Sequence, residues 1–122
     1  MTYEKTALEG ALIVTPRVDR VDMTNADAFK EALLEAVGLA STVLVVDMSH
    51  LDYISSAGLR SLMIAHKAAK SDQKTLSLAA LRPLTTEIFT ISRFNLVFTL
   101  YGGVREALTA LAPDSVAQFD GL

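Results

Sequence analysis

The chain has 122 residues, of which 51% are hydrophobic and 20% are charged, and its formal net charge is −3. This length suits one domain with its own hydrophobic core. The slight negative charge argues against a nucleic-acid-binding surface, and the absence of cysteine excludes a disulfide framework and a cysteine-based zinc site. No charged-then-apolar leader opens the sequence and no apolar run approaches membrane length, so we expect a cytoplasmic protein that does not bind membranes.

The first 23 residues have the pattern of a β-hairpin followed by a loop. Strands are expected over residues 3–8 and 11–17, and Glu9-Gly10 between them fits a tight turn. Pro16 stands at the end of the second run, where it can close a strand without breaking it. A polar loop over residues 17–23 follows.

A helix over residues 25–37 and a strand over residues 42–46 are predicted next. The segment that begins at Thr24 has the form of a capping box, and Gly38 fits a helix C-cap. After Thr42 the strand is entirely apolar, which is typical of a central strand that helices cover on both sides.

The stretch from residue 47 to residue 62, DMSHLDYISSAGLRSL, lies where that strand ends and a new helix begins. A strand–loop–helix turn places its loop at the carboxyl edge of a sheet, where α/β proteins usually place function. Ser55 or Ser56 stands where an N-cap is wanted. The free N–H groups of a helix start can also tolerate a phosphate on a nearby hydroxyl.

The helix that follows is predicted over residues 57–70, and its two faces differ. The side chains expected to point inward are Leu59, Leu62, Met63, His66 and Ala69. A lone histidine on such a face is expected to pack there and not to act as a ligand or base. Arg60 and Ile64 lie on the opposite side, four residues apart, and therefore form one surface patch.

The remaining elements continue the alternation of strand and helix. They are a strand over 75–80, a helix over 85–92 with Ile88 and Ile91 inward, a short strand over 97–100 and a helix over 104–111. We expect the tail over residues 113–122 to be frayed. The fold class is therefore α/β: one domain over residues 1–112 with a mostly parallel sheet of 4–5 strands, an antiparallel edge strand and about four helices.

The stretch after the central strand resembles a known family. Asp47-Met48-Ser49, followed by Tyr53-Ile54-Ser55-Ser56-Ala57-Gly58-Leu59, resembles the signature of STAS domains, and most of all that of bacterial anti-sigma factor antagonists. The resemblance covers about residues 3–112. In that family the serine two residues before the glycine is phosphorylated, which implies Ser56. Many antagonists carry Asp just before this serine, whereas this chain has Ser55, the second choice for the modified residue.

The resemblance implies partner switching. The unphosphorylated chain would bind an anti-sigma factor that is also a serine kinase, phosphorylation of Ser56 would block this binding, and a serine phosphatase would reverse it. The chain has no phosphate-binding glycine motif, so ATP would be held by the kinase and no cofactor by this chain. The implied partner-binding residues are Asp22, Ser55, Ser56, Ala57, Arg60 and Ile64, and the implied structural residues of the loop are Asp47, Ser49 and Gly58.

Two alternatives of other classes remain open on the sequence. The first is a STAS accessory subunit of a transport or lipid-trafficking assembly, which phosphorylation does not switch. The second is a small hydrolase with Ser56 as nucleophile, because His50 lies near Asp47 and Asp52 in the loop. The G-x-S-x-G elbow is absent, and we therefore expect no enzyme activity.

Overall fold

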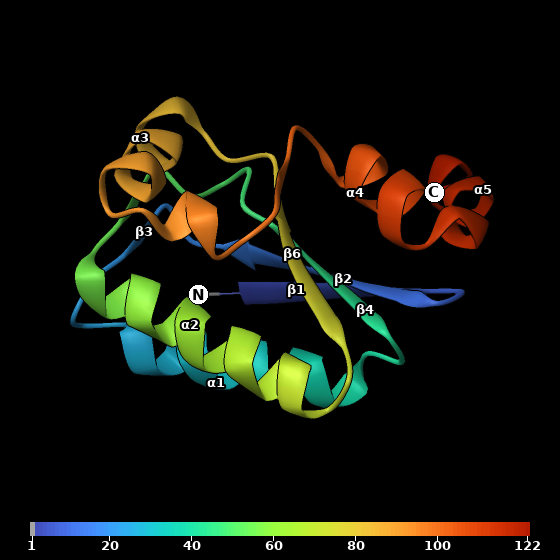
Figure 1. Ribbon diagram of the computed structural model, residues 1–122, viewed down its shortest axis with the longest axis horizontal. Helices are drawn as coiled ribbons and strands as arrows, with labels where there is room; N and C mark the ends of the chain where they lie inside the picture. The colour runs from blue at the N-terminus through green and yellow to red at the C-terminus, as the bar shows by residue number, and fades with distance from the viewer. Residues whose placement is uncertain (1) are drawn as a thin grey trace.

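The computed structural model describes residues 2–122, and a five-stranded sheet with the order β1-β2-β4-β6-β7 forms its centre (Figure 1). The strands are β1 (Thr2–Leu8), β2 (Ala11–Arg17), β4 (Val43–Asp47), β6 (Thr75–Ala79) and β7 (Leu100–Tyr101). β1 pairs antiparallel with β2, and the other neighbours pair in parallel. The predicted α/β class, with one antiparallel edge strand, is confirmed.

The opening hairpin is also confirmed. Leu8 pairs with Ala11, so that the turn between the strands holds Glu9 and Gly10 alone. Gly10 has a φ of 80°, a conformation that glycine adopts without the steric cost of a Cβ.

Helices cover both faces of the sheet. They are α1 (Ala26–Leu39), α2 (Ser56–Ser71), α3 (Pro83–Ile91), α4 (Val104–Leu111) and α5 (Val116–Asp120), with short 3₁₀ helices η1 (Phe94–Leu96) and η2 (Pro113–Ser115). α1 and α2 lie side by side along one face, and α4 and α5 lie on the other (Figure 1).

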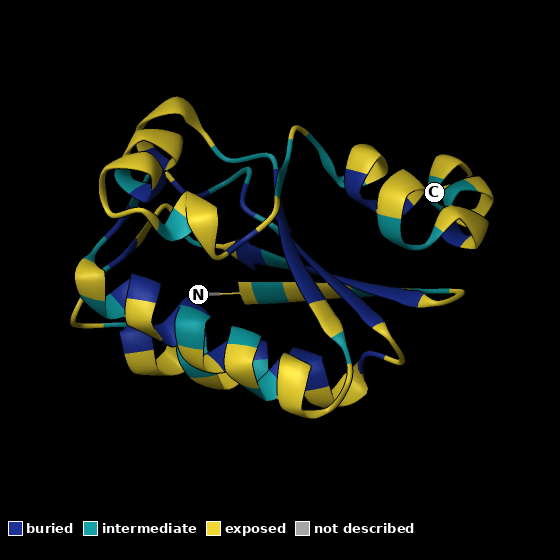
Figure 2. Ribbon diagram, in the orientation of Figure 1, coloured by how far each residue is buried: buried dark blue, intermediate teal, exposed yellow. Residues whose placement is uncertain are grey.

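The central strand β4 shows why both faces need a cover. Leu44 and Val46 belong to the larger core with α1 and α2, whereas Val43 and Val45 belong to the smaller core with α4. Figure 2 shows β4 and β6 buried along most of their length. The prediction of an apolar strand between two helical layers is confirmed.

The predicted ends of α1 are wrong at both termini. Thr24 is not the N-cap, because Asn25 holds that position without a side-chain capping bond and the Thr24 hydroxyl donates to Asp22 instead. Gly38 is not the C-cap, because the helix continues through it to Leu39 and Ala40 closes it.

The prediction for the segment after β6 is wrong in three details. α3 begins at Pro83, whose missing N–H suits the first turn of a helix. Phe89 is fully buried, while Ile91, predicted to face inward, is 77% exposed. The strand predicted over residues 97–100 lies later, at Leu100–Tyr101, because residues 97–99 form the turn that follows η1.

The prediction of a frayed tail is also wrong, since residues 113–120 are helical. Arg105 holds Asp120 through two hydrogen bonds of 3.0 and 3.1 Å, and the Glu9 N–H donates to Gln118 at 2.6 Å. Val116 and Phe119 pack against the smaller core. Tertiary contacts therefore order a segment whose composition is typical of a loose end.

A second, two-stranded sheet lies where only loops were predicted. β3 (Arg20–Val21) pairs in parallel with β5 (Tyr53–Ile54). The Asp19 carbonyl accepts from the Asp52 N–H at 2.7 Å, and the Val21 carbonyl accepts from the Ser55 N–H at 2.9 Å. These bonds tie the loop before α1 to the loop before α2.

Candidate functional site

The start of α2 is held against the small sheet by a glycine. A Cβ on Gly58 would lie 2.6 Å from Ile54 Cγ1 and 2.8 Å from Val21 Cγ1, and both neighbours are buried. Only a residue without a side chain allows this approach. The predicted structural role of Gly58, to permit close contact between helix and strand, is therefore seen in the contacts.

A shallow depression lies beside the first turn of α2. Its volume is about 430 Å³, and it is lined by Asp22, Met23, Ser55, Ser56, Ala57 and Arg60. We call it the Ser56 depression. Five of these six residues belong to the predicted partner-binding set: Asp22 comes from the loop before α1, and the other four come from the start of α2. The pairing of β3 with β5 brings the two loops together.

The two adjacent serines have different environments. Ser55 is the N-cap of α2 and is half-buried, and its Oγ accepts from the Gly58 N–H over a long 3.5 Å. Ser56 is the first residue of the helix and is exposed, and its hydroxyl has no hydrogen-bond partner within residues 2–122. Of the two hydroxyls, that of Ser56 is the more accessible from outside.

Asp22 is fixed in the wall of the Ser56 depression. Its Oδ1 accepts from the Thr24 hydroxyl at 2.5 Å and from the Thr24 N–H at 2.9 Å, and its Oδ2 accepts from Arg20 Nε at 3.2 Å. The hydrogen bonds from Thr24, and secondarily Arg20, lower the pKa of Asp22 below its usual value of 3.8. Asp22 is thus a fixed negative charge in the same lining as Arg60.

The acids of the β4–α2 loop have structural partners. Asp47 ends β4, and its Oδ1 accepts from the Ser49 N–H at 3.0 Å. Arg82 then joins two points of the loop, since it donates to the Ser49 carbonyl and to Asp52 Oδ1, each at 2.6 Å. Asp47 and Ser49 lie outside the Ser56 depression, and their hydrogen bonds stabilise the conformation of the loop.

A second hollow continues from the Ser56 depression along α2. It measures about 280 Å³, and Met23, Ala57 and Arg60 line both hollows. Ile64 lies in its wall with 39% of its surface exposed. The predicted Arg60–Ile64 patch on the outer face of α2 is confirmed as a surface feature.

A family model described as "Mlab, STAS domain" matches residues 18–100, which is more than half of the chain. The chain belongs to the STAS domain family. BtrV of Bordetella bronchiseptica, named as a predicted anti-sigma factor antagonist, is 37% identical to this STAS domain over 90 residues, or 74% of this chain and 77% of BtrV.

Solved structures share the fold of this STAS domain at lower identity. An anti-sigma factor antagonist from Mycobacterium paratuberculosis is 24% identical and superposes with a TM-score of 0.80, covering 90% of this chain and 92% of its own. The antagonist SpoIIAA in its unphosphorylated form is 9% identical, with a TM-score of 0.66 over 99% and 98% of the chains.

The same fold also occurs in a transporter. Part of the murine anion transporter Slc26a9 is 14% identical, with a TM-score of 0.72 over 84% of this chain and 18% of the transporter. At such identities the likeness shows the fold alone. The fold of this STAS domain is therefore compatible both with a regulator and with an accessory subunit of a transporter.

The histidines of this STAS domain lie apart from the Ser56 depression. His66 packs on Phe98 with the ring centroids 4.9 Å apart, and burial, followed by the charge of Lys70, lowers the pKa of His66. Its predicted packing role agrees with these contacts. No hydrogen bond within residues 2–122 joins His50 to Ser56, and Asp47 and Asp52 are engaged elsewhere.

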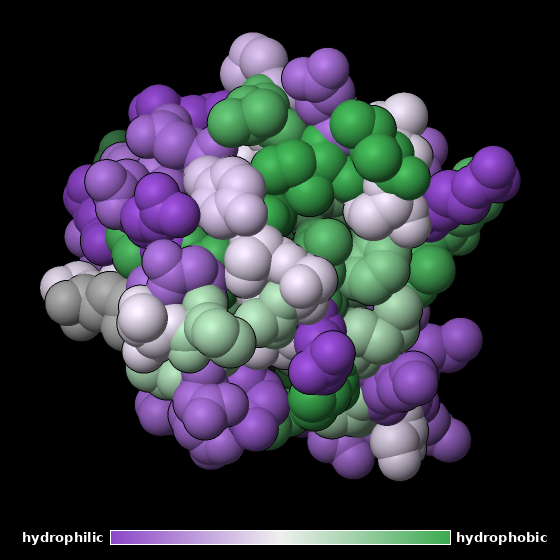
Figure 3. Space-filling model, turned by 90° about the vertical axis from the view of Figure 1, so that its left-hand side faces the viewer, coloured by the Kyte–Doolittle hydropathy of each residue, from purple (hydrophilic) through white to green (hydrophobic). Residues whose placement is uncertain are grey.

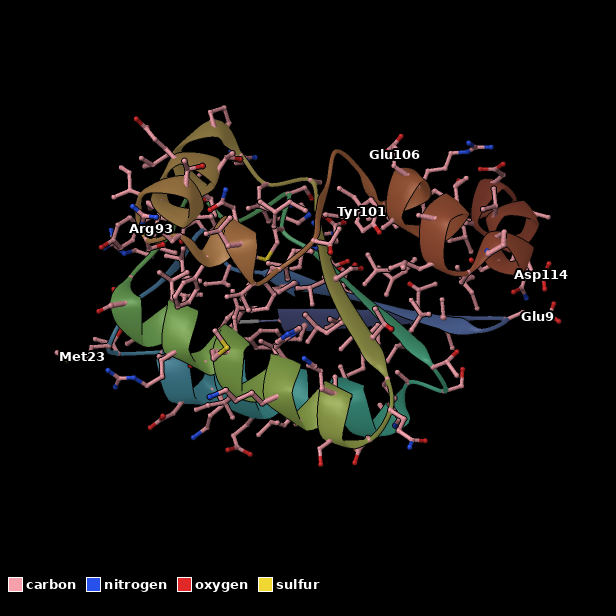
Figure 4. All side chains as sticks on the ribbon, in the orientation of Figure 1. Glu9, Met23, Arg93, Tyr101, Glu106 and Asp114 are labelled. Carbon is pink, nitrogen blue, oxygen red and sulfur yellow. The ribbon has the colours of Figure 1, made fainter. Side chains whose placement is uncertain are left out.

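Two features of this end of the molecule were not predicted from the sequence. Met23 is 86% exposed and projects from the loop before α1 (Figure 4), where it lines both hollows. The segment from the start of α3 to the residue after η1 also exposes large hydrophobic side chains, namely Leu84, Ile91, Leu96 and Val97. Figure 3 looks onto this end, and hydrophobic surface gathers over its upper part. Isolated loop or helix residues give no periodic signal that would reveal such a group.

Within residues 2–122 no group of three or more potential metal-ligating side chains lies close enough to hold an ion. No helix in the same range is long and apolar enough to span a membrane.

Proposed function

We propose that this STAS domain is an anti-sigma factor antagonist of a partner-switching pathway, in the cytoplasm and without enzyme activity of its own. The unmodified form binds an anti-sigma factor with serine kinase activity and thereby frees the sigma factor. One observation carries the proposal: Ser56, the residue that matches the phosphorylated serine of antagonists, is exposed at the rim of a depression lined by the predicted partner-binding residues. The identity with BtrV supports the same role.

The modification itself is a phosphoryl transfer from ATP bound to the partner kinase. The Ser56 oxygen forms a bond to the γ-phosphorus, the bond from that phosphorus to the ADP oxygen breaks, and the hydroxyl proton leaves to a base of the kinase. Ser56 meets the first requirement for this step because its hydroxyl is exposed and has no hydrogen-bond partner among residues 2–122. A serine phosphatase then restores the binding form.

The phosphate changes the charge of the surface but has little effect on the fold. It adds about −1.5 to −2 charges at neutral pH, close to the fixed carboxylate of Asp22. At the first residue of α2 the helix itself tolerates a negative group, because the first-turn N–H groups carry partial positive charge. The partner contact is therefore lost while the domain stays folded.

The alternative, an accessory subunit of a transport or lipid-trafficking assembly, uses the same fold without a modified serine. The two roles differ in what happens to Ser56 in the cell. The test is the intact mass and a peptide map of the protein purified from its own host, with and without phosphatase treatment. We expect a phosphatase-sensitive phosphate in the peptide that contains Ser56. A protein that stays unmodified under all growth conditions would refute the switching role.

A further inference from the structure

Arg60 is the one basic side chain in the lining of the Ser56 depression. It is exposed, and within residues 2–122 it forms neither an ion pair nor a side-chain hydrogen bond. An arginine side chain without a partner keeps all its donors available for an anion that arrives later.

The other arginines of this end are already engaged. Arg20 donates to Asp22 at 3.2 Å and lies over the Tyr53 ring, 5.0 Å from its centroid. Arg82 donates to Asp52 and to the Ser49 carbonyl, each at 2.6 Å. Both arginines are thus already paired with a carboxylate of this chain, whereas Arg60 is paired with none within residues 2–122.

The spacing along α2 favours Arg60 in a second way. Ser56 and Arg60 are four residues apart on one helix, so their side chains are neighbours on the same face. An anionic side chain that precedes a cationic one by four residues is the more favourable order of the two. Arginine and phosphate also match in shape and form two parallel hydrogen bonds.

We infer that Arg60 is the intramolecular counter-ion of a phosphate on Ser56, and that modification thereby withdraws Arg60 from the surface that contacts the partner. The inference rests on the proposed function, since it assigns a mechanism to that switch. The carboxylate of Asp22, in the same lining, carries a like charge and therefore repels the phosphate. Before modification, the same guanidinium is available to a carboxylate on the anti-sigma factor. Phosphorylation then removes an attractive contact as well as adding a repulsive charge.

The test uses the whole chain with phosphoserine placed genetically at position 56. Phosphorus-31 NMR follows the second ionisation of the phosphate with pH in this protein, in an Arg60→Ala variant and in a Lys67→Ala variant. Lys67 is an exposed cation of the same helix, eleven residues from Ser56, and serves as the matched control. A nearby guanidinium stabilises the dianion, so we expect Arg60→Ala to raise this pKa by about 0.5 unit, and Lys67→Ala by far less. Equal shifts in the two variants would overturn the inference.

Binding provides the second measurement. Calorimetry of the unmodified protein with the anti-sigma factor of its own host should show that Arg60→Ala weakens binding by about fivefold or more, as for a contact at an interface. Arg60→Gln, which keeps the side-chain stem, separates charge from packing and should weaken binding equally. Unchanged affinity in both variants would mean that there is no contact to withdraw, and would overturn the inference.

The two kinds of failure can be told apart. The NMR measurement needs neither kinase nor partner, so it judges the pairing of Arg60 with the phosphate alone. The mass of the protein from its own host judges whether Ser56 is modified at all.

Discussion

Gly58 of α2 lies so close to Ile54 of β5 that a Cβ on the glycine would meet Ile54 Cγ1 at 2.6 Å. Val21 of β3 closes the other side at 2.8 Å, and neither neighbour can move into solvent because both are buried. This contact fixes the height at which α2, and with it Ser56, stands above the small sheet.

The first prediction concerns this contact. Gly58→Ala should destabilise the protein by about 1–3 kcal/mol, because overpacking outweighs the gain of about 1 kcal/mol in helix propensity. Urea unfolding measures the change. Gly38→Ala is the matched control, since Gly38 also lies in a helix but a Cβ there meets nothing within 4 Å. That variant should be unchanged or more stable by up to about 1 kcal/mol, and equal losses in both variants would contradict the packing argument.

The second prediction separates the two serines. Ser56→Ala should abolish phosphate transfer from ATP by the cognate kinase, whereas Ser55→Ala should keep most of it. For stability, Ser55→Ala should be the more harmful of the two. It removes the N-cap of α2 and should cost about 0.5 kcal/mol, the low end for such caps because the hydrogen bond to Ser55 Oγ is long. Phosphate incorporation and urea unfolding measure the two effects. Transfer that persists in Ser56→Ala and vanishes in Ser55→Ala would reassign the site to Ser55.

The third prediction concerns the nature of the switch. Ser56→Asp places a negative charge at the first residue of α2, which the helix tolerates and which is worth about 0.3–1 kcal/mol in its favour. The thermal midpoint should therefore stay within a few degrees of the wild type, while binding to the anti-sigma factor is lost. Scanning calorimetry and a binding titration measure both quantities. Loss of the folded state would mean instead that the switch is conformational.

The fourth prediction places Ile64 in the interface. Ile64→Glu should weaken binding by tenfold or more, about 1.4 kcal/mol, with little loss of stability because the side chain is already 39% exposed. Ile91→Glu is the control, since it makes the same substitution at an exposed position of α3. Affinity that survives Ile64→Glu would remove this residue from the site.

The fifth prediction follows from the hydrogen bonds to Asp22. The pKa of Asp22, measured by NMR of its carboxyl carbon, should lie below 3.8. It should rise in Thr24→Val, which removes the hydroxyl donor. A carboxyl group whose pKa is lowered by folding stabilises the folded protein at pH values above the pKa of that group in the unfolded state. This stabilisation is lost as the pH falls through the pKa of the group in the folded state. The wild type should therefore lose stability in acid more steeply than Thr24→Val does. Identical acid dependence in the two proteins would show that the bond does not form in solution.

The sequence by itself determined the elements whose signals are long or chemically specific. The apolar run of β4 predicted a strand between two layers, since no other arrangement buries both of its faces. The outer position of Ile64 followed from helical periodicity alone. The motif around Ser56 indicated the STAS family, because hydroxyls, an acid and a glycine at fixed spacing carry information that composition does not.

Only the tertiary structure decided the features that depend on contacts between distant residues. The β3–β5 pair is two residues long on each side, too short for a periodic signal, and yet it brings Asp22 to the wall of the Ser56 depression. The Thr24 hydroxyl donates to Asp22 instead of capping α1, because the loop geometry offers a carboxylate in place of a helix N–H. The tail became helical for a similar reason, since Arg105 and the smaller core lie where Asp120 and Phe119 can reach them. Local sequence sets the long elements, while long-range contacts set the short ones and decide which side chains meet.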